Sequence, residues 1–368
     1  MAARPSCTEP VDDRLEAHRG LGEGTGDVDM LTCDERRSPP EDRRSQPDRL
    51  PVRRPNWSVC MDVNVVILNW NAAQDTVASL RRLARWTQVE SRIWVVDNGS
   101  HPDESAAIAL ACPAANLLRS ERNLGFSGGT NLALRRLVEE SVAPVLLLNS
   151  DVRIDESAVA ALIDTLHRQP QCGIVGPVIV TAAEPQQVQS AGSRSPLLHR
   201  DHTIRTPPTD RPIYGVESVS GAAVLIRMTV LQRVGLLDEA YFFGLELADL
   251  CRRARDEGFL CLVNSTVRAE HDLERSSSLR ETLYVYYAVR NRLLYARRSH
   301  PVAWPGPVTI WALYGLQQGI RLWIKRRRGT AIAILLGVRD GLRGRFGDQN
   351  AAVLSACASR PSNGGAAE

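Results

Sequence analysis

Three hydrophobic stretches of the chain each end in polar side chains that could bind a charged ligand. One stretch ends in Asn69, a second in Asp97, and a third in the sequence Asn-Ser-Asp at 149–151. Open α/β sheets bind their ligands in the crevice outside the carboxyl ends of the strands. We therefore predict one shared site at such an edge. The alternative for each residue alone is a turn or cap, which is the commoner role of a lone Asp after a strand.

The elements that must position these side chains are strands and amphipathic helices that alternate from residue 62 to about residue 180. Such alternation predicts an α/β fold, Rossmann-like, with a mostly parallel central sheet, right-handed crossovers and helices on both faces. We expect strands at 63–68, 92–96, 116–118, 145–149 and 173–180. We expect helices at 75–86 and 103–111, a helix that the segment 122–131 opens and that runs to about residue 140, and one that starts directly after the Asn-Ser-Asp tip with Asp155 as its N-cap.

Regular alternation stops near residue 180. The following segment is rich in Pro, Ser and Arg, and it predicts a long loop, which is often functional in a compact domain. We expect this loop at 181–215, a strand at 218–227, helices at 249–257 and 280–298, and a sheet-based domain that spans 61–298.

Tryptophan and basic residues distinguish the region 299–346. Trp311 and Trp323 interrupt apolar segments, and the run Lys-Arg-Arg-Arg follows at 325–328. Aromatic residues beside basic clusters are typical of amphipathic helices that lie on an anionic membrane surface. We expect such helices here, with peripheral membrane contact; the alternative is a pair of helices packed on the main domain.

Composition narrows the class of protein. A net charge of +3 over 368 residues argues against a strong polyanion binder, and no nucleic-acid recognition module is visible. The eight cysteines form no Cys-x-x-Cys pair, which argues against a zinc ribbon or a disulfide framework and fits a reducing compartment. Residues 1–60 and 347–368 predict disordered tails. We expect no secretion signal and no membrane-spanning helix.

A series of short motifs, each weak alone, runs in order through residues 62–298. The motifs are Val-Val-Ile-Leu-Asn-Trp-Asn at 65–71, Val-Val-Asp-Asn-Gly-Ser at 95–100, Arg-Asn-Leu-Gly-Phe-Ser-Gly-Gly-Thr-Asn at 122–131, Leu-Leu-Asn-Ser-Asp at 147–151, Ser-Gly-Ala at 220–222, Leu-Asp-Glu at 237–239, Phe-Phe at 242–243, Glu246 with Asp-Leu-Cys at 249–251, His271, Tyr-Tyr at 286–287 and Arg-Asn at 290–291. In this order they resemble the family 2 glycosyltransferases, in the branch that includes bacterial rhamnosyltransferases. The resemblance implies the GT-A fold and the inverting transfer of a sugar from a nucleotide-sugar donor.

The same resemblance implies a metal site at the Asn-Ser-Asp sequence. Asp151 matches the metal-binding end of the family's DxD-like motif, and Asn149 stands at its first acidic position. His271 matches a later His that coordinates the metal or the diphosphate; without the family context, a polar-loop His is the commoner reading. A divalent cation neutralises a diphosphate leaving group. Oxygen ligands suit Mg²⁺ or Mn²⁺, and a His favours Mn²⁺.

Nucleotide contacts are implied as well. Asp97 matches the residue that reads the base or the ribose, since a carboxylate accepts hydrogen bonds from both. Gly128 and Gly129 would let the backbone, and the N–H groups of the helix that starts there, approach the ligand. The remaining expected contacts to the nucleotide sugar are Asn69, Arg122, Asn123 and Asn149.

One position departs from the family's pattern, where the general base is expected. That base is usually the second acid of a Glu-Asp or Glu-Glu pair, and Leu247 stands there. Three readings stay open: Glu246 takes the role, Asp249 assists from one turn further on, or the protein is catalytically impaired. We predict Glu246 and Asp249 as the catalytic residues. The structural alternative is that both acids stabilise the start of a helix through its dipole.

These features predict an inverting, metal-dependent glycosyltransferase in the cytoplasm, peripheral at the inner face of the cell membrane. The favoured donor is a dTDP- or UDP-sugar that carries rhamnose, with a hexose left open. The expected acceptor is a lipid-linked saccharide, another glycan or a small natural product, and no nucleic acid. The alternatives are a catalytically impaired nucleotide-sugar-binding protein and a nucleotidyltransferase. The latter would carry a Gly-rich signature with a Lys near the first strand, which the chain lacks.

Overall fold

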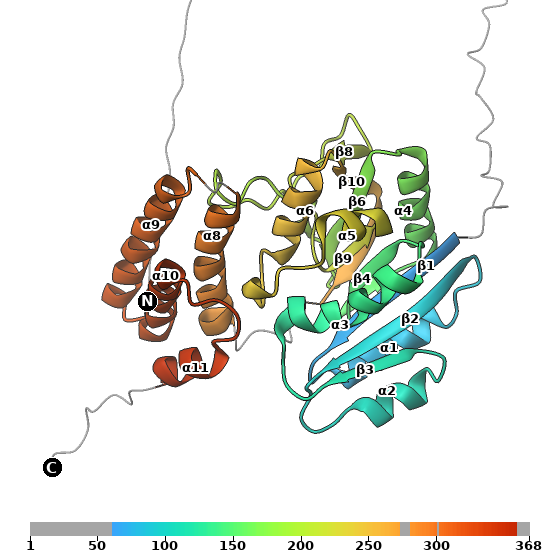
Figure 1. Cartoon of the computed structure of the whole chain (residues 1–368), viewed down its shortest axis with the longest axis horizontal. Helices are drawn as coiled ribbons and strands as arrows, with labels where there is room; N and C mark the ends of the chain where they lie inside the picture. Colours follow the sequence, from blue (N-terminus) through green and yellow to red (C-terminus); the bar gives the residue numbers. More distant parts are fainter. Residues whose placement is uncertain (1–60, 273–279, 300–301, 359–368) are drawn as a thin grey trace, which may run out of the picture. The chain divides into compact units, whose positions relative to one another are not determined.

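The computed structural model describes residues 61–272, 280–299 and 302–358 (Figure 1). The tail predicted at 1–60 and the last ten residues of the chain lie outside the described residues. Within this part a central sheet carries helices on both faces, and a group of helices follows it in the sequence. The α/β fold predicted from the alternation of strands and helices is therefore confirmed.

The sheet of the described residues has ten strands, in the order β3-β2-β1-β4-β9-β6-β10-β5, with β7 beside β6 and β8 beside β10. Alternate residues of a strand face opposite sides, so Val65 and Ile67 join one hydrophobic cluster and Val66 joins the other. The strands are β1 (Met61–Asn69), β2 (Val89–Asn98), β3 (Asn116–Ser120), β4 (Val145–Asn149), β5 (Val152–Ile154), β6 (Cys172–Thr181), β7 (Val188–Ser190), β8 (Ile213–Gly215), β9 (Ala223–Ile226) and β10 (Leu260–His271).

Most paired residues of the sheet lie in parallel pairs, as predicted, and antiparallel strands are inserted among them. Strands β3, β2, β1 and β4 are parallel, as the alternation with helices predicts. Strand β9 is antiparallel to both β4 and β6, whereas β10 is parallel to β6 and antiparallel to β5. Short strands and turns precede β9 in place of a crossover helix, so its connection does not impose a parallel direction.

Three local predictions need correction. The predicted loop at 181–215 contains β7 and β8, whose edge pairings are too short to leave a clear alternating pattern in the sequence. The predicted strand at 218–227 is formed only at 223–226. Strand β5 intervenes between the Asn-Ser-Asp tip and the next helix, and Asp155 stands at the N-cap without a side-chain capping bond.

Helices on the two faces bury the two clusters of the sheet. Leu80 of α1, Ile108 of α2 and Leu162 of α4 pack on one face. Leu134 of α3 and Leu250 of α6 pack on the other. The helices are α1 (Ala73–Leu83), α2 (Ser105–Ala111), α3 (Gly125–Glu140), α4 (Glu156–Arg168), α5 (Met228–Val234) and α6 (Glu246–Asp256).

In the described residues after the sheet, a π-helical turn (Arg280–Tyr284) leads into the α-helices α8 (Val285–Ser299), α9 (Pro305–Ile324), α10 (Arg328–Arg343) and α11 (Asn350–Ala358). Helix α11 contradicts the disordered tail predicted from residue 347. Its Val353 is 1% exposed and packs in a cluster with Phe242, Tyr287 and Ala333. This buried contact stabilises a short helix that its small, weakly amphipathic sequence does not reveal. The domain boundary predicted at residue 298 stays a prediction. Helix α8 lies almost wholly before this boundary, and it packs against α10, which lies after it.

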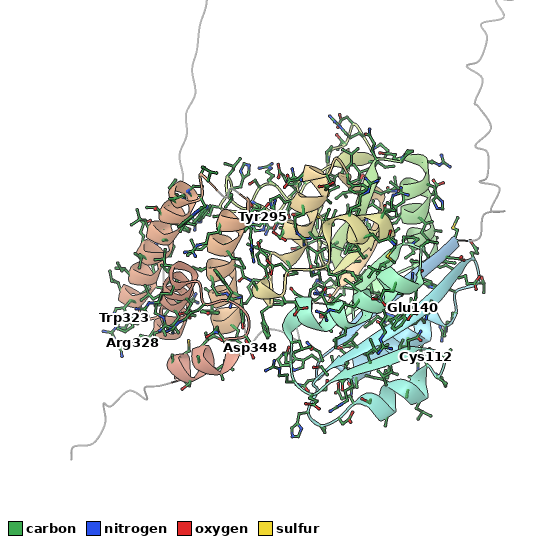
Figure 2. All side chains as sticks on the ribbon, viewed as in Figure 1. Cys112, Glu140, Tyr295, Trp323, Arg328 and Asp348 are labelled. Atoms are coloured by element: carbon green, nitrogen blue, oxygen red, sulfur yellow. The ribbon has the colours of Figure 1, made fainter. Side chains whose placement is uncertain are left out.

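Helix α9 has two different faces. Small residues let one face approach α10 closely: a Cβ on Gly315 would lie 2.5 Å from Val338, and one on Gly319 would lie 2.8 Å from Leu335. Apolar side chains are exposed along the rest of the helix, namely Ile310, Leu313, Leu316, Ile320, Trp323 and Ile324. Trp323 and Arg328 lie near each other at the end of this helix pair (Figure 2). Among the described helices, none has the length and hydropathy needed to cross a membrane.

Candidate active site

The Asn-Ser-Asp tip lies next to His271 because two strands pair. Strand β4 ends at Asn149, and β5 begins just beyond Asp151. The antiparallel register of β5 and β10 sets His271 opposite Val152. As a result, Nε2 of His271 lies 3.3 Å from Oδ1 of Asp151, although 120 residues separate them in the chain. The structure therefore brings together the two residues predicted as metal ligands.

This donor pair fits a divalent cation that also binds phosphate. The side chains of Asp151 and His271 are 29% and 16% exposed, so both are accessible from one side. Among the described residues, no group of three or more His, Cys, Asp or Glu side chains is arranged to hold a metal. Protein sites for Mg²⁺ commonly supply one or two ligands and leave the others to water and substrate phosphates. A pair of protein ligands is thus compatible with a cation whose other ligands would come from water and a phosphate.

Asp97 is enclosed by protein groups at the end of β2. Its side chain is fully buried, with Oδ1 3.2 Å from Nδ2 of Asn69 and Oδ2 2.5 Å from Nη1 of Arg119. The side chain of Arg119 is 37% exposed and pairs with Asp103 as well. In this structure Asp97 therefore orients Arg119. For Asp97 to contact a nucleoside directly as well, one of the lone pairs of the Asp97 carboxylate would have to be free.

Sequence reasoning missed Arg119, although a signal for it exists. The parallel register of β2 and β3 sets Arg119 directly opposite Asp97. The sequence predicts this strand at 116–118, whereas β3 continues to Ser120. The two additional residues include Arg119. An arginine beside a buried carboxylate at the binding edge of a sheet is a candidate for contact with a phosphate or a base.

The glycines at the start of α3 serve packing within the protein. A Cβ on Gly129 would lie 2.6 Å from Leu68 and 2.9 Å from Asn98, and one on Gly128 would lie 2.9 Å from Leu124. The N–H groups of Phe126 and Ser127, in the first turn of α3, donate to the carbonyl oxygen of Phe242 at 2.7 and 3.4 Å. In this structure these glycines and N–H groups contact protein atoms, and their approach to a ligand stays a prediction.

Two other expected nucleotide contacts have different surroundings. Asn123 uses its Oδ1 to accept from Nδ2 of Asn98 and from the N–H of Gly125. Arg122 is exposed, and its carbonyl accepts from the hydroxyl of Ser120 at 2.7 Å. The side chain of Arg122 thus remains accessible to a ligand, whereas Asn123 fixes the turn that leads into α3.

Glu246 begins α6 with a carboxyl group in an unusual environment. The residue is 8% exposed, and its Oε2 has no hydrogen-bond partner among the described residues. Burial raises the pKa of Glu246 to about 7, against nearby backbone N–H groups that favour the ionised form. Gly221 borders this carboxyl group, since a Cβ there would lie 3.9 Å from Oε1. Such a carboxyl group is suited to proton transfer near neutral pH.

The two neighbours of Glu246 in the predicted motif have structural roles. Leu247 is 4% exposed and belongs to the hydrophobic cluster of α3, α5 and α6. Asp249 is 1% exposed, with Oδ2 2.8 Å from Nε of Arg253 and Oδ1 3.3 Å from Nη2 of Arg252. These ion pairs occupy Asp249, so among the buried carboxyl oxygens of α6 only Oε2 of Glu246 lacks a partner in the described part of the chain.

Arg290 and Asn291 of α8 hold the loop that leads into Glu246. Arg290 is fully buried and donates to the carbonyl oxygen of Tyr241 at 2.8 Å. Asn291 donates to the carbonyl oxygens of Tyr241, Phe243 and Gly244 at 2.7 to 2.9 Å. The Arg-Asn motif at 290–291 does not by itself indicate this role, because contacts of side chains to carbonyl groups leave no pattern in the sequence.

This loop contains strained backbone. Phe242 and Leu245 have φ angles of 60° and 69°, in the left-handed region that side chains other than glycine rarely adopt. Such conformations cost about 1–3 kcal/mol each and persist only where surrounding contacts enforce them. Strain that directly precedes Glu246 is typical of a functional site.

Comparison with known proteins agrees with this arrangement. Residues 64–235 match the family model described as glycosyl transferase family 2. A hexosyltransferase of low-salt glycan biosynthesis, Agl10 from Haloferax volcanii, is 26% identical over 239 residues, which cover 63% of this chain and 75% of the relative. An N-acetylglucosaminyl-diphospho-decaprenol L-rhamnosyltransferase from Mycobacterium tuberculosis is 24% identical over 279 residues, which cover 68% and 89%.

Two solved structures share the fold. The mannosyltransferase PcManGT from Pyrobaculum calidifontis, in complex with GDP-Man and Mn²⁺, has a TM-score of 0.51 at 12% identity, over 78% of this chain and 89% of that chain. GalNAc-T7 with UDP, GalNAc and Mn²⁺ has a TM-score of 0.51 at 16% identity, over 67% of this chain and 52% of that one.

The mixed sheet, with its polar strand ends, is that of the GT-A class of glycosyltransferases. Residues 64–235 carry a domain that matches glycosyl transferase family 2, and the chain is an enzyme of glycosyl transfer. Glu246 and His271 lie beyond the matched segment.

Proposed function

We propose that this glycosyltransferase is metal-dependent and inverting, and that it moves a sugar from a dTDP- or UDP-sugar to a lipid-linked saccharide or another glycan. The proximity of Asp151 and His271 carries the proposal, since this pair offers a carboxylate and an imidazole beside the end of β4. We propose rhamnose as the sugar. The similarity to the mycobacterial rhamnosyltransferase supports this choice, and the hexosyltransferase Agl10 keeps a hexose as its rival.

Each residue has a defined part in this proposal. Asp151 and His271 would hold Mg²⁺ or Mn²⁺, which when bound neutralises the diphosphate that leaves the sugar. Arg119 and Arg122 lie on the nucleotide side, with Asp97 and Asn69 fixing Arg119. Glu246 accepts the proton of the acceptor hydroxyl as that oxygen forms its bond to the anomeric carbon and the bond to the diphosphate breaks.

Leu247 is the reason for a second candidate, a nucleotide-sugar-binding protein with impaired catalysis. The burial of Leu247 means that an acid at this position would face a hydrophobic cluster. Glu246, in contrast, has an unpaired oxygen and a pKa of about 7, which burial raises. These observations favour an active enzyme that uses Glu246 as its general base over a binding protein with impaired catalysis.

A thermal-shift panel with transfer assays tests the proposal. The panel contains dTDP-, UDP- and GDP-sugars, each with and without Mn²⁺. A ligand that binds the folded state raises the unfolding temperature, so we expect a shift with one dTDP- or UDP-sugar that requires the metal. Release of the nucleoside diphosphate then separates an active enzyme from a binding protein. A chain that no donor stabilises would contradict the proposal.

Membrane contact is the remaining part of the proposal. Ile310 is 65% exposed, Ile320 is 58% exposed and Ile324 is 75% exposed, all on α9. The basic run at 325–328, which is exposed throughout, follows directly. An exposed apolar helix face beside clustered positive charge fits an anionic lipid surface.

A further inference from the structure

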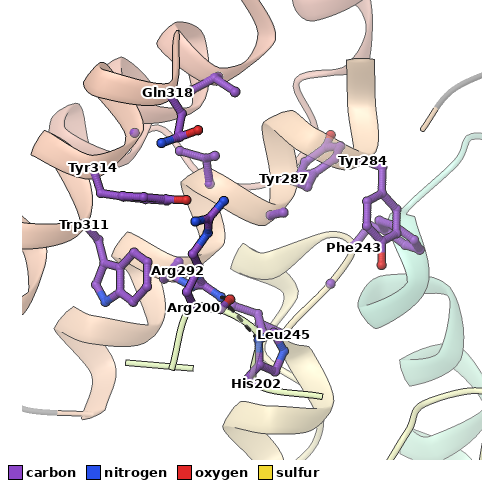
Figure 3. Close-up of a pocket in the computed structure, with 15 residues that line it drawn as sticks. Arg200, His202, Phe243, Leu245, Tyr284, Tyr287, Arg292, Trp311, Tyr314 and Gln318 are labelled. Carbon is purple, nitrogen blue, oxygen red and sulfur yellow. Dashed lines mark hydrogen bonds between the residues drawn. The ribbon is translucent and has the colours of Figure 1, made fainter. Parts of the chain in front are cut away.

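A cavity of about 450 Å³ lies where α8 and α9 meet two loops (Figure 3). One loop contains Arg200 and His202, and the other contains Phe243, Gly244 and Leu245. The cavity is therefore bounded by the residue that directly precedes Glu246. The cavity is separate from the proposed donor site, because neither Asp151 nor His271 lines it.

Two arginines supply positive charge to this cavity without a matching acid. Arg200 and Arg292 both line it, whereas its lining contains no Asp or Glu. Among the described residues, neither guanidinium forms an ion pair with a carboxylate. Nη2 of Arg292 donates to the carbonyl oxygen of Arg200 at 3.2 Å, and its buried Nε has no partner within the described part of the chain. Arg200 is exposed, whereas Arg292 is partly buried. Unmatched buried charge is costly, so a bound anion would stabilise Arg292.

His202 adds no positive charge at neutral pH. Its Nδ1 lies 3.2 Å from Nη2 of Arg292. Burial, with the nearby Arg292, lowers the pKa of His202 to about 4. The neutral ring is thus an acceptor that orients Arg292, and the charge of the cavity comes from the two arginines.

Aromatic rings make the rest of the wall apolar. The guanidinium of Arg292 lies 4.1 Å from the ring centroid of Trp311, and that of Arg200 lies 5.2 Å from the ring centroid of Tyr314. Gly315 and Ile334 line the wall next to these rings. Figure 3 shows the two arginines between the rings of α9 and His202. Guanidinium groups that lie over aromatic rings can still present N–H groups to an anion.

We propose that this cavity binds the phosphate-bearing end of an anionic amphiphile, with the phosphate at Arg200 and Arg292 and the hydrocarbon chain along Trp311 and Tyr314. The exposed pair Phe243 and Tyr284, whose ring centroids are 5.6 Å apart, lies on the side toward Glu246. A sugar attached to the phosphate could stack there, which makes the bound molecule the acceptor. This last assignment rests on the proposed glycosyl transfer.

Calorimetric titration of the full chain with farnesyl phosphate, below its aggregation concentration, tests the site without a donor. Farnesol and inorganic phosphate are the comparison ligands. We expect farnesyl phosphate to bind at least tenfold more tightly than either, because each comparison ligand lacks one half of the recognised chemistry. We expect Arg200→Gln to weaken its binding about tenfold, since charge-assisted hydrogen bonds are among the strongest in proteins. Arg292→Met should do the same while keeping the contact with Trp311.

The matched control is Arg168→Gln, an exposed arginine at the end of α4, which should leave binding unchanged. Equal affinity for inorganic phosphate would overturn the amphiphile and leave a simple anion site. Equal affinity for farnesol, or unchanged binding by Arg200→Gln, would overturn the phosphate site. The donor thermal shift is measured on the same variants. A normal donor shift without farnesyl phosphate binding contradicts this inference alone, whereas the absence of any donor shift contradicts the proposed function.

Discussion

At the scale of single residues, the carboxyl group of Glu246 sets the expected pH dependence of transfer. Burial raises its pKa to about 7, and only the ionised form accepts a proton. The transfer rate should therefore rise with pH, reach half its plateau near pH 7 and level off above it. Glu246→Gln should lower the rate about a hundredfold or more while donor binding persists.

The control for this prediction is Glu257→Gln, an exposed acid just beyond the same helix. It should leave both the rate and the pH profile unchanged. Steady-state rates between pH 5 and 9, with donor binding measured in parallel, decide the matter. An unchanged rate in Glu246→Gln would remove this residue from the mechanism.

Asp151 and His271 set the dependence of donor binding on metal. Asp151→Asn or His271→Ala should remove most of the extra thermal shift that Mn²⁺ adds to the nucleotide-sugar complex, because each variant deletes one of two adjacent donors. The matched control is His167→Ala, an exposed histidine on α4. A metal-dependent shift that survives both substitutions would show that the cation binds elsewhere.

At the scale of elements, α8 controls the loop that carries the strained backbone before Glu246. Asn291→Ala would remove the side-chain donor of the carbonyl groups of Phe243 and Gly244, whereas the carbonyl of Tyr241 keeps its bond from Arg290. Buried polar groups without partners cost about 1–3 kcal/mol each, so the free energy of unfolding should fall by about 2 kcal/mol or more. Denaturant unfolding measures this change.

An exposed arginine on the same helix gives the comparison for Asn291→Ala. The side chain of Arg298 is 54% exposed and pairs with Asp238. Exposed pairs contribute about 1 kcal/mol or less, so Arg298→Gln should change stability little. Equal effects of the two variants would mean that the loop contacts do not support the fold.

Sequence patterns predicted most strands and helices of the α/β part because each element has a clear hydrophobic period. They also predicted that Asn149, Asp151 and Asp97 end strands. They did not predict strand order, so the insertion of antiparallel β9 between β4 and β6 was missed. Arg119 was missed for the same reason, since its relation to Asp97 exists only in the register of β2 and β3. Helix α11 forms through tertiary burial of Val353, which local sequence does not encode.

At the scale of the whole molecule, the exposed face of α9 predicts binding to anionic membranes. Ile320→Glu together with Trp323→Glu should weaken binding to vesicles of phosphatidylglycerol, because both side chains are largely exposed and apolar. Binding should also fall with rising salt, since the basic run at 325–328 contributes electrostatic attraction. Co-sedimentation with vesicles measures both effects.

Leu110→Glu is the control for membrane binding, because Leu110 of α2 is 83% exposed but has no basic cluster beside it in the sequence. It should bind vesicles as the unaltered chain does. Equal loss of binding in this control would indicate a general effect of added negative charge. Binding to neutral phosphatidylcholine vesicles at the same strength would contradict an electrostatic contribution.

The pairing of β5 with β10 has a consequence for how the protein is made. Asp151 leaves the ribosome 120 residues before His271, and the two meet only when the last strand of the sheet docks. Contacts between residues so far apart in the chain form late in folding, because a long loop must close first. A nascent or truncated chain that ends at residue 235 would hold the matched family segment and still lack both His271 and Glu246. The capacity to use a donor would therefore arise in a single late step, after most of the sheet is in place.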